Sequence, residues 1–76
     1  REYDSSLFKE LRRLRKEIAE EEEVPPYIVF NDATLLELAR EKPKTSSALL
    51  LINGIGQRKL ERFGQRVLEA ICLHQE

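Results

Sequence analysis

Two adjacent prolines, Pro25 and Pro26, divide this 76-residue chain between two segments with helical periodicity. Each proline fixes φ near about −65° and removes a backbone donor, so the turn between the segments is stiff before any tertiary contact forms. The next residue is Tyr27, whose ring therefore has little backbone freedom left to lose. Such a ring is either a packing residue or a platform on which a nucleobase stacks, and the sequence leaves both interpretations open.

The segment before the prolines has the spacing of an amphipathic helix. Its apolar residues recur at intervals of four, three and four: Leu7, Leu11, Leu14 and Ile18. This spacing places them on one face at about 100° per residue. Ser5 or Ser6 is expected to cap the helix, because a hydroxyl accepts from the free amides of the first turn. Glutamates at 20–23 oppose the helix dipole, so the helix is predicted to end near residue 21.

A short second helix is expected between the prolines and Pro43. Asn31 or Asp32 can cap its first turn, and Leu35 and Leu38 then face inward. The helix is predicted to end at Pro43, because the residue before a proline disfavours the α-helical region.

Thr45 is expected to cap a third, still shorter helix that places Leu49 and Ile52 inward. Asn53 and Gly54 are predicted to end that helix. Beyond this break the apolar periodicity resumes and continues to residue 71.

Gly64 lies on the apolar face of this last segment. It is either a point of close packing or a break that divides the segment into two helices. No segment alternates apolar and polar residues over a useful length, so strands are not expected. The sequence therefore predicts an all-α domain.

Composition narrows the class of function. The net charge is −1 with 36% charged residues, so only a local basic patch could bind nucleic acid. The single cysteine, Cys72, excludes an internal disulfide and has no His or Cys at metal-ligand spacing. No signal peptide and no apolar run near the ~18–20 residues of a membrane span is found, so a soluble cytoplasmic chain is expected.

The sequence contains no motif of an enzyme. A Gly-rich phosphate loop, a nucleophile with a base at a recognisable spacing and a His/Cys metal cluster are all missing. No catalytic residue, cofactor or metal is therefore predicted for this chain.

The segment Gly54-Ile55-Gly56 has the pattern of the hairpin in a helix-hairpin-helix motif. Its glycines would permit a tight turn and leave backbone N–H groups free to hold a phosphate. The alternative is that they only let the flanking helices pack closely. If Gly56 needs positive φ, Gly56→Val should destabilise the fold by more than about 1 kcal/mol.

Basic residues lie opposite the apolar face on two helical segments. On the first segment they are Lys9, Arg12, Arg13 and Lys16, with Arg15 on the flank. After the hairpin they are Arg58, Lys59, Arg62 and Arg66. Either set could form a phosphate track or simply solvate an outer face. The predicted phosphate contacts are Arg15, Lys16, Arg58, Lys59 and Arg62.

In this order the motifs resemble the HRDC domain, named for its place in helicases and RNase D C-terminal regions. The resemblance spans about residues 5–73 and is carried by residues 7–16, 24–30, 32–35, 54–56 and 59–64. The form at the C-terminus of bacterial RecQ DNA helicases is especially similar. An RNase D-type nuclease, which would change the partner to RNA, is a third possibility.

The resemblance implies a compact bundle of about five short helices with a 3₁₀ turn near Pro25–Tyr27. It also implies a single domain over 1–76, a monomer and a fragment of a larger bacterial 3′–5′ helicase that uses ATP and Mg²⁺. The domain would then bind single-stranded or branched DNA through Tyr27. The alternative function is a protein-contact module that docks on the helicase core or a repair partner.

Overall fold

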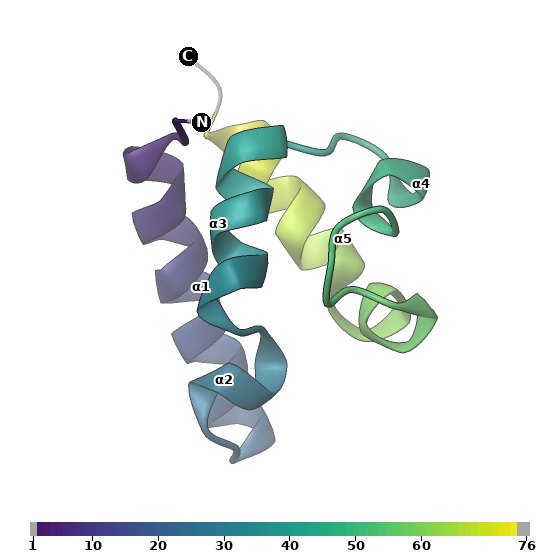
Figure 1. Cartoon of the computed structure of the whole chain (residues 1–76). Coiled ribbons are helices and arrows are strands. Elements are labelled where there is room, and N and C mark those ends of the chain that lie inside the picture. The colour runs from purple at the N-terminus through teal and green to yellow at the C-terminus, as the bar shows by residue number, and fades with distance from the viewer. Residues whose placement is uncertain (1, 75–76) are drawn as a thin grey trace.

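The computed structural model describes residues 2–74, and helices are the only regular elements in that range. They are α1 (Ser5–Glu22), α2 (Pro26–Val29), α3 (Asp32–Glu41), α4 (Ser46–Leu49) and α5 (Gln57–Leu73). Arg1 and residues 75–76 lie outside this description. The long helices α1 and α5 and the shorter α3 form a bundle, and α2 turns the chain from α1 into α3 (Figure 1). The predicted all-α bundle is confirmed.

The first helix begins at Ser5, one residue earlier than a Ser5 cap and two residues earlier than a Ser6 cap would place it. Asp4 is the cap, and its Oδ1 accepts a hydrogen bond of 3.0 Å from the Leu7 N–H. The prediction of Ser5 or Ser6 was therefore wrong, because both serines lie in the first turn. At the other end α1 extends to Glu22, and Glu23 takes a left-handed φ of 59°.

The segment after Pro25 is a single turn of α-helix, which corrects the expected 3₁₀ turn. Its first hydrogen bond has 3₁₀ spacing, from Ile28 N–H to Pro25 O at 3.0 Å, but the next joins Phe30 N–H to Pro26 O at 3.4 Å. The prolines occupy the cap and first helical positions, where a missing N–H costs nothing. Pro26 therefore starts a helical turn that Val29 ends.

The caps of the next two helices follow the prediction. Asn31 Oδ1 accepts from the Thr34 N–H at 2.8 Å, and Thr45 Oγ1 accepts from the Ala48 N–H at 3.1 Å. The helix α4 ends at Leu49, earlier than predicted. Turns then carry the chain onward, and they still place Ile52 in the core.

The helix α5 runs without interruption through Gly64. A Cβ at this position would lie 2.7 Å from Leu60 Cδ1 and 3.6 Å from Leu49 Cδ2. Gly64 is thus a point of close packing between α5 and α4, and the alternative of a helix break was wrong. The structure therefore has five helices for a different reason from the one considered in the sequence analysis: the turn after Pro25 is helical, and the segment after Gly56 is a single helix.

The core collects the apolar faces of all five helices. Its largest fully buried side chains are Leu7, Leu11, Ile18, Val29, Leu35, Leu38, Leu49, Val67 and Ile71. Phe30 and Phe63 pack edge to face with ring centroids 5.9 Å apart, which joins the end of α2 to α5.

The hairpin between α4 and α5 requires a special backbone conformation at one glycine only. Gly54 has φ of +94°, and a Cβ there would overlap Thr34 Oγ1, which itself donates to Asn53 O at 2.9 Å. Gly56 has φ of −102° and ψ of −174°, and a Cβ there would meet no other atom within 4 Å. The condition on which the Gly56→Val prediction depended, a positive φ at Gly56, is not met, and Gly54 is the constrained position.

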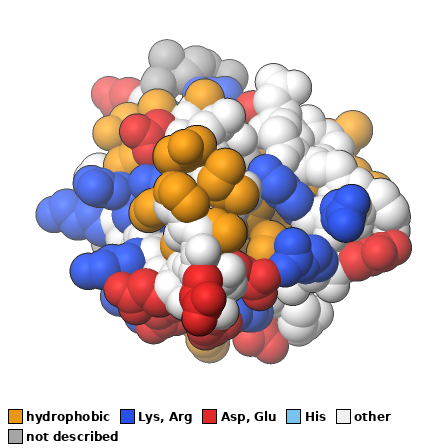
Figure 2. Space-filling view, turned by 90° about the horizontal axis from the view of Figure 1, so that it is seen from below, with side chains coloured by type: hydrophobic (Ala, Val, Ile, Leu, Met, Phe, Trp, Pro, Cys, Tyr) orange, Lys and Arg blue, Asp and Glu red, His pale blue; other side chains and the backbone are white. Residues whose placement is uncertain are grey.

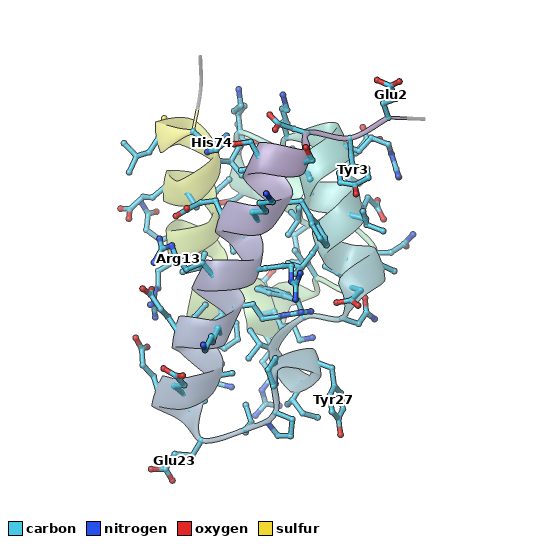
Figure 3. All side chains as sticks on the ribbon, turned by 90° about the vertical axis from the view of Figure 1, so that its left-hand side faces the viewer. Glu2, Tyr3, Arg13, Glu23, Tyr27 and His74 are labelled. Carbon is cyan, nitrogen blue, oxygen red and sulfur yellow. The ribbon has the colours of Figure 1, made fainter. Side chains whose placement is uncertain are left out.

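The two ends of the described chain meet at one end of the bundle. Tyr3 and His74 lie at that end, whereas Tyr27 and Glu23 lie at the opposite end (Figure 3). Among residues 2–74, no helix has both the length and the apolar character that crossing a membrane requires.

Candidate nucleic-acid interface

Tyr27 projects from α2 into solvent. Consecutive helical residues are about 100° apart, so the burial of Val29 toward the core directs the side chain two positions earlier away from it. The ring of Tyr27 is accordingly 67% exposed, and the neighbouring Ile28 is 51% exposed. Figure 3 shows Tyr27 pointing away from the rest of the bundle. The structure thus places the ring where a planar ligand can reach it.

The turn that carries Tyr27 is held by Arg15. This residue is 9% exposed, and its Nη1 donates to Phe30 O at 2.9 Å and to Asp32 Oδ1 at 2.9 Å. The sequence predicted Arg15 as a phosphate contact, but its guanidinium is engaged inside the protein. Its observed role is to tie α1 to the junction of α2 and α3.

A basic groove borders α2 on the side of α1. It has a volume of about 430 Å³ and is lined by Lys9, Arg12, Arg13, Arg15, Lys16 and Pro26. Within it Arg13 is already paired with Glu10 and with Glu17, the latter at 2.6 Å. No carboxylate of residues 2–74 lies within ion-pair distance of Lys16 or Arg12. We call this surface the α1 groove.

A smaller pocket borders α2 on the side of α5. Its volume is about 120 Å³, and it is lined by Glu22, Val24, Ile28, Val29, Arg58, Lys59, Arg62 and Phe63. Lys59 Nζ lies 5.6 Å from the centroid of the Phe30 ring, and Arg62 Cζ lies 5.0 Å from that of Phe63. We call this surface the α5 pocket. It brings the predicted cations after the hairpin next to the α2 turn.

The two basic surfaces flank an apolar centre on one face. Seen from the α2 end, hydrophobic side chains gather in the middle, Lys and Arg lie on two sides, and Asp and Glu follow the lower edge (Figure 2). Sequence reasoning missed the apolar part of this face, because Val24 and Ile28 meet Phe63 only in the folded chain. The one signal in the sequence was an apolar residue directly after Tyr27.

The acidic edge pairs with two arginines of α5. Glu21 accepts from Arg66 at 2.8 and 3.1 Å, and Glu22 pairs with Arg62. The hydrogen bond from Arg66 lowers the pKa of Glu21, and the same contact raises the pKa of Arg66. These pairs partly neutralise the cations furthest along α5, whereas Arg58 has no carboxylate of residues 2–74 within ion-pair distance.

The hairpin glycines lie beside this cationic start of α5. Gly56 is the N-cap of α5 and supplies no side-chain acceptor to the first-turn amides. At Gly54 the direction of a Cβ points at the Thr34 side chain of α3. Among residues 2–74 no cluster of three or more His, Cys, Asp or Glu side chains could hold a metal ion.

Comparisons with known proteins agree with this architecture. The model of the HRDC domain family matches residues 4–71. The chain is 56% identical over 72 residues to the ATP-dependent DNA helicase RecQ of Haemophilus influenzae, covering 95% of this chain, and 43% identical over 68 residues to that of Bacillus subtilis, covering 90%. It spans only 12% of the length of either relative.

A solved structure shows the same fold. It is the third HRDC domain of RecQ from D. radiodurans, which is 36% identical to this chain. The superposition has a TM-score of 0.87 and covers 93% of this chain and 96% of the other. The family match, the sequence relatives and this superposition lead to one conclusion: the chain belongs to the HRDC domain family.

Proposed function

We propose that this domain is an auxiliary DNA-binding module that engages single-stranded or branched DNA without sequence specificity. The observation that carries the proposal is the solvent-facing ring of Tyr27 on a turn held by Arg15, between two basic surfaces. A base stacks on Tyr27, and Lys16, Arg58 and Lys59 meet phosphates on either side. Stacking suits every base, because each has a π-face.

The expected affinity is low. Stacking of one base contributes about 1–3 kcal/mol, and the net charge of −1 gives no global attraction for a polyanion. With two or three phosphates neutralised, log K should fall with log salt at a slope of about −0.7 per phosphate. The domain therefore steers a larger enzyme and does not retain DNA by itself.

The larger enzyme is, in this proposal, a RecQ-type helicase. The relatives named above are ATP-dependent DNA helicases of which this chain matches about one eighth of the length. Such a parent would use ATP and Mg²⁺ in its core and act in DNA repair and recombination in the bacterial cytoplasm. This domain would contribute substrate choice as a monomeric unit and no chemistry.

Fluorescence polarisation with a labelled oligo-dT at low salt tests the proposal. Tyr27→Ala should raise Kd by about tenfold, as expected for the loss of one stacked base, whereas Tyr27→Phe should bind like the original chain. Tyr3→Ala is the matched control, because Tyr3 is also exposed but lies at the other end of the bundle. No binding by the original chain, or equal binding by Tyr27→Ala, would refute the proposal.

A second candidate function is protein contact, favoured by an apolar surface far from Tyr27. Leu51 is 81% exposed and borders a groove of about 240 Å³ that also includes Glu37 and Glu41. This candidate predicts that Leu51→Ser weakens association with the helicase core or a repair partner while oligo-dT binding stays unchanged. Titrating a separately produced helicase core with the original chain and with Leu51→Ser, and comparing the two values of Kd, would decide between the candidates.

A further inference from the structure

The α5 pocket has a floor and a rim of different chemistry. Val29 and Phe63 are buried at its base, and Val24 and Ile28 form its apolar wall. Its cations stand at the rim, where Lys59 and Arg62 each rest against an aromatic ring. Glu22 also lines the pocket and pairs with Arg62, so Arg58 and Lys59 are the lining cations with no carboxylate of residues 2–74 within ion-pair distance. On the side of these two cations the pocket fits a flat, largely apolar group that carries a negative charge at one edge.

The pocket is continuous with the surface that carries Tyr27. Tyr27 and Ile28 are consecutive in α2, so their side chains diverge by about 100° with a rise of about 1.5 Å. One faces solvent and the other lines the pocket. The stacking surface and the pocket therefore lie on the same helical turn, so a ligand longer than one unit can contact both.

We propose that the α5 pocket receives the base of a second nucleotide on the same single strand, adjacent to the one stacked on Tyr27. This inference rests on the proposed function and adds a subsite to it. The phosphate of that nucleotide lies on Arg58, which is exposed and has no carboxylate of residues 2–74 within ion-pair distance. The strand accordingly crosses α2 from the α1 groove toward α5.

The lining of the subsite determines its preference among bases. Four of the eight lining residues are apolar, Val24, Ile28, Val29 and Phe63, and the other four are charged. Apolar side chains discriminate by contact with the C5-methyl group of thymine, and they offer no donor or acceptor to a base edge. The subsite is therefore tolerant of sequence and has a modest preference for thymine over uracil.

The test uses this chain with labelled oligo-dT and oligo-dU of equal length. Ile28→Ser removes the apolar wall and should raise Kd for oligo-dT by about fivefold, as expected for lost burial of part of one side chain. The preference for dT over dU should also vanish. Leu51→Ser is the matched control. Leu51 is more exposed than Ile28, and it lines the groove beside α4 and not the α5 pocket.

A second variant and an NMR measurement test the subsite in a way that does not depend on whether Ile28→Ser folds. Arg58→Gln changes an exposed side chain and should flatten the salt slope by about 0.7, whereas Lys44→Gln should not. Nuclear Overhauser contacts between a thymine methyl and the side chains of Ile28 or Phe63 would support the subsite directly.

The outcomes separate this inference from the proposed function. If Tyr27→Ala raises Kd about tenfold while Ile28→Ser and Arg58→Gln leave Kd and the salt slope unchanged, the stacking site stands and the subsite is overturned. If the original chain does not bind oligo-dT, both are overturned. If an acidic peptide with one Phe shifts the resonances of Val24 and Phe63 while oligo-dT does not, the pocket is a peptide site and the nucleotide subsite is again overturned.

Discussion

Arg15 and Phe30 are 15 residues apart in sequence, yet Arg15 Nη1 donates a hydrogen bond of 2.9 Å to the main-chain oxygen of Phe30. The bond is buried and charge-assisted, and it fixes the backbone directly after α2. Asp32 accepts from the same nitrogen but is itself exposed. The orientation of the turn that carries Tyr27 therefore depends on a side chain from α1.

Arg15→Ala should lower the free energy of unfolding by about 2 kcal/mol, because it leaves a buried carbonyl without its charged donor. For a domain of this size that corresponds to a fall in Tm of roughly 10 °C, which circular dichroism can follow. Asp32→Asn should have a much smaller effect, since the Asp32 side chain is 79% exposed. Equal melting temperatures for Arg15→Ala and the original chain would show that the bond does not hold the turn.

Gly54→Ala should destabilise the fold by about 1–2 kcal/mol, because its φ of +94° disfavours any residue with a Cβ. The new methyl group would also overlap the side chain of Thr34. Gly56→Ser should change stability by less than about 0.5 kcal/mol, because Gly56 is an N-cap with open space around it. Urea unfolding of both variants checks the contrast, and an equal loss in both would contradict it.

The double variant Glu21→Gln/Glu22→Gln should bind oligo-dT more tightly, by about threefold at low salt, and with a steeper salt dependence. It removes the carboxylate partner of Arg62 in the α5 pocket and the nearer of the two partners of Arg66, which keeps Glu17 at 3.8 Å. Polarisation titrations at two salt concentrations measure both quantities. Glu37→Gln/Glu69→Gln removes the same charge away from the pocket, and an equal gain in that control would refute a local effect.

Stability should decrease in acid partly through Asp4. The hydrogen bond from the Leu7 N–H lowers the pKa of Asp4 in the folded chain. A carboxyl group with a lowered folded-state pKa stabilises the fold above its unfolded pKa, near about 4, and loses that contribution as pH falls through the folded value. Asp4→Asn keeps a capping oxygen but does not titrate, so its Tm should fall less between neutral pH and pH ~2. Parallel pH curves for the two chains would exclude this role.

The local rules for helix caps located the starts of α3 and α4. Thr45 caps α4 as predicted, and of the two candidates Asn31 and Asp32 it is Asn31 that caps α3. At the start of α1 three consecutive residues can cap, 4–6, and local spacing does not distinguish them. The helix α5 also runs through Gly64 despite the low helix propensity of glycine, and Gly64 is buried there beside Leu60 and Leu49.

The candidate site was only partly predictable for a different reason. The ring of Tyr27 and the cations of α5 were found from residue type, but their proximity is a tertiary property. Arg15 and Lys16 are neighbours in sequence, and only the position of Phe30 shows that one is buried and the other is free to meet a ligand. Periodicity identifies the face of a helix but not what the rest of the chain places against it.

The chain enters and leaves the bundle at the end opposite α2. A second DNA-binding unit joined at either terminus would therefore be anchored behind the Tyr27 face and would leave that face unobstructed. Within one molecule, such a tether sets an effective concentration of about 1 mM. A site with a Kd of about 10 μM would then be occupied about 99% of the time. Weak intrinsic affinity would thus permit rapid exchange along a strand without loss of the strand.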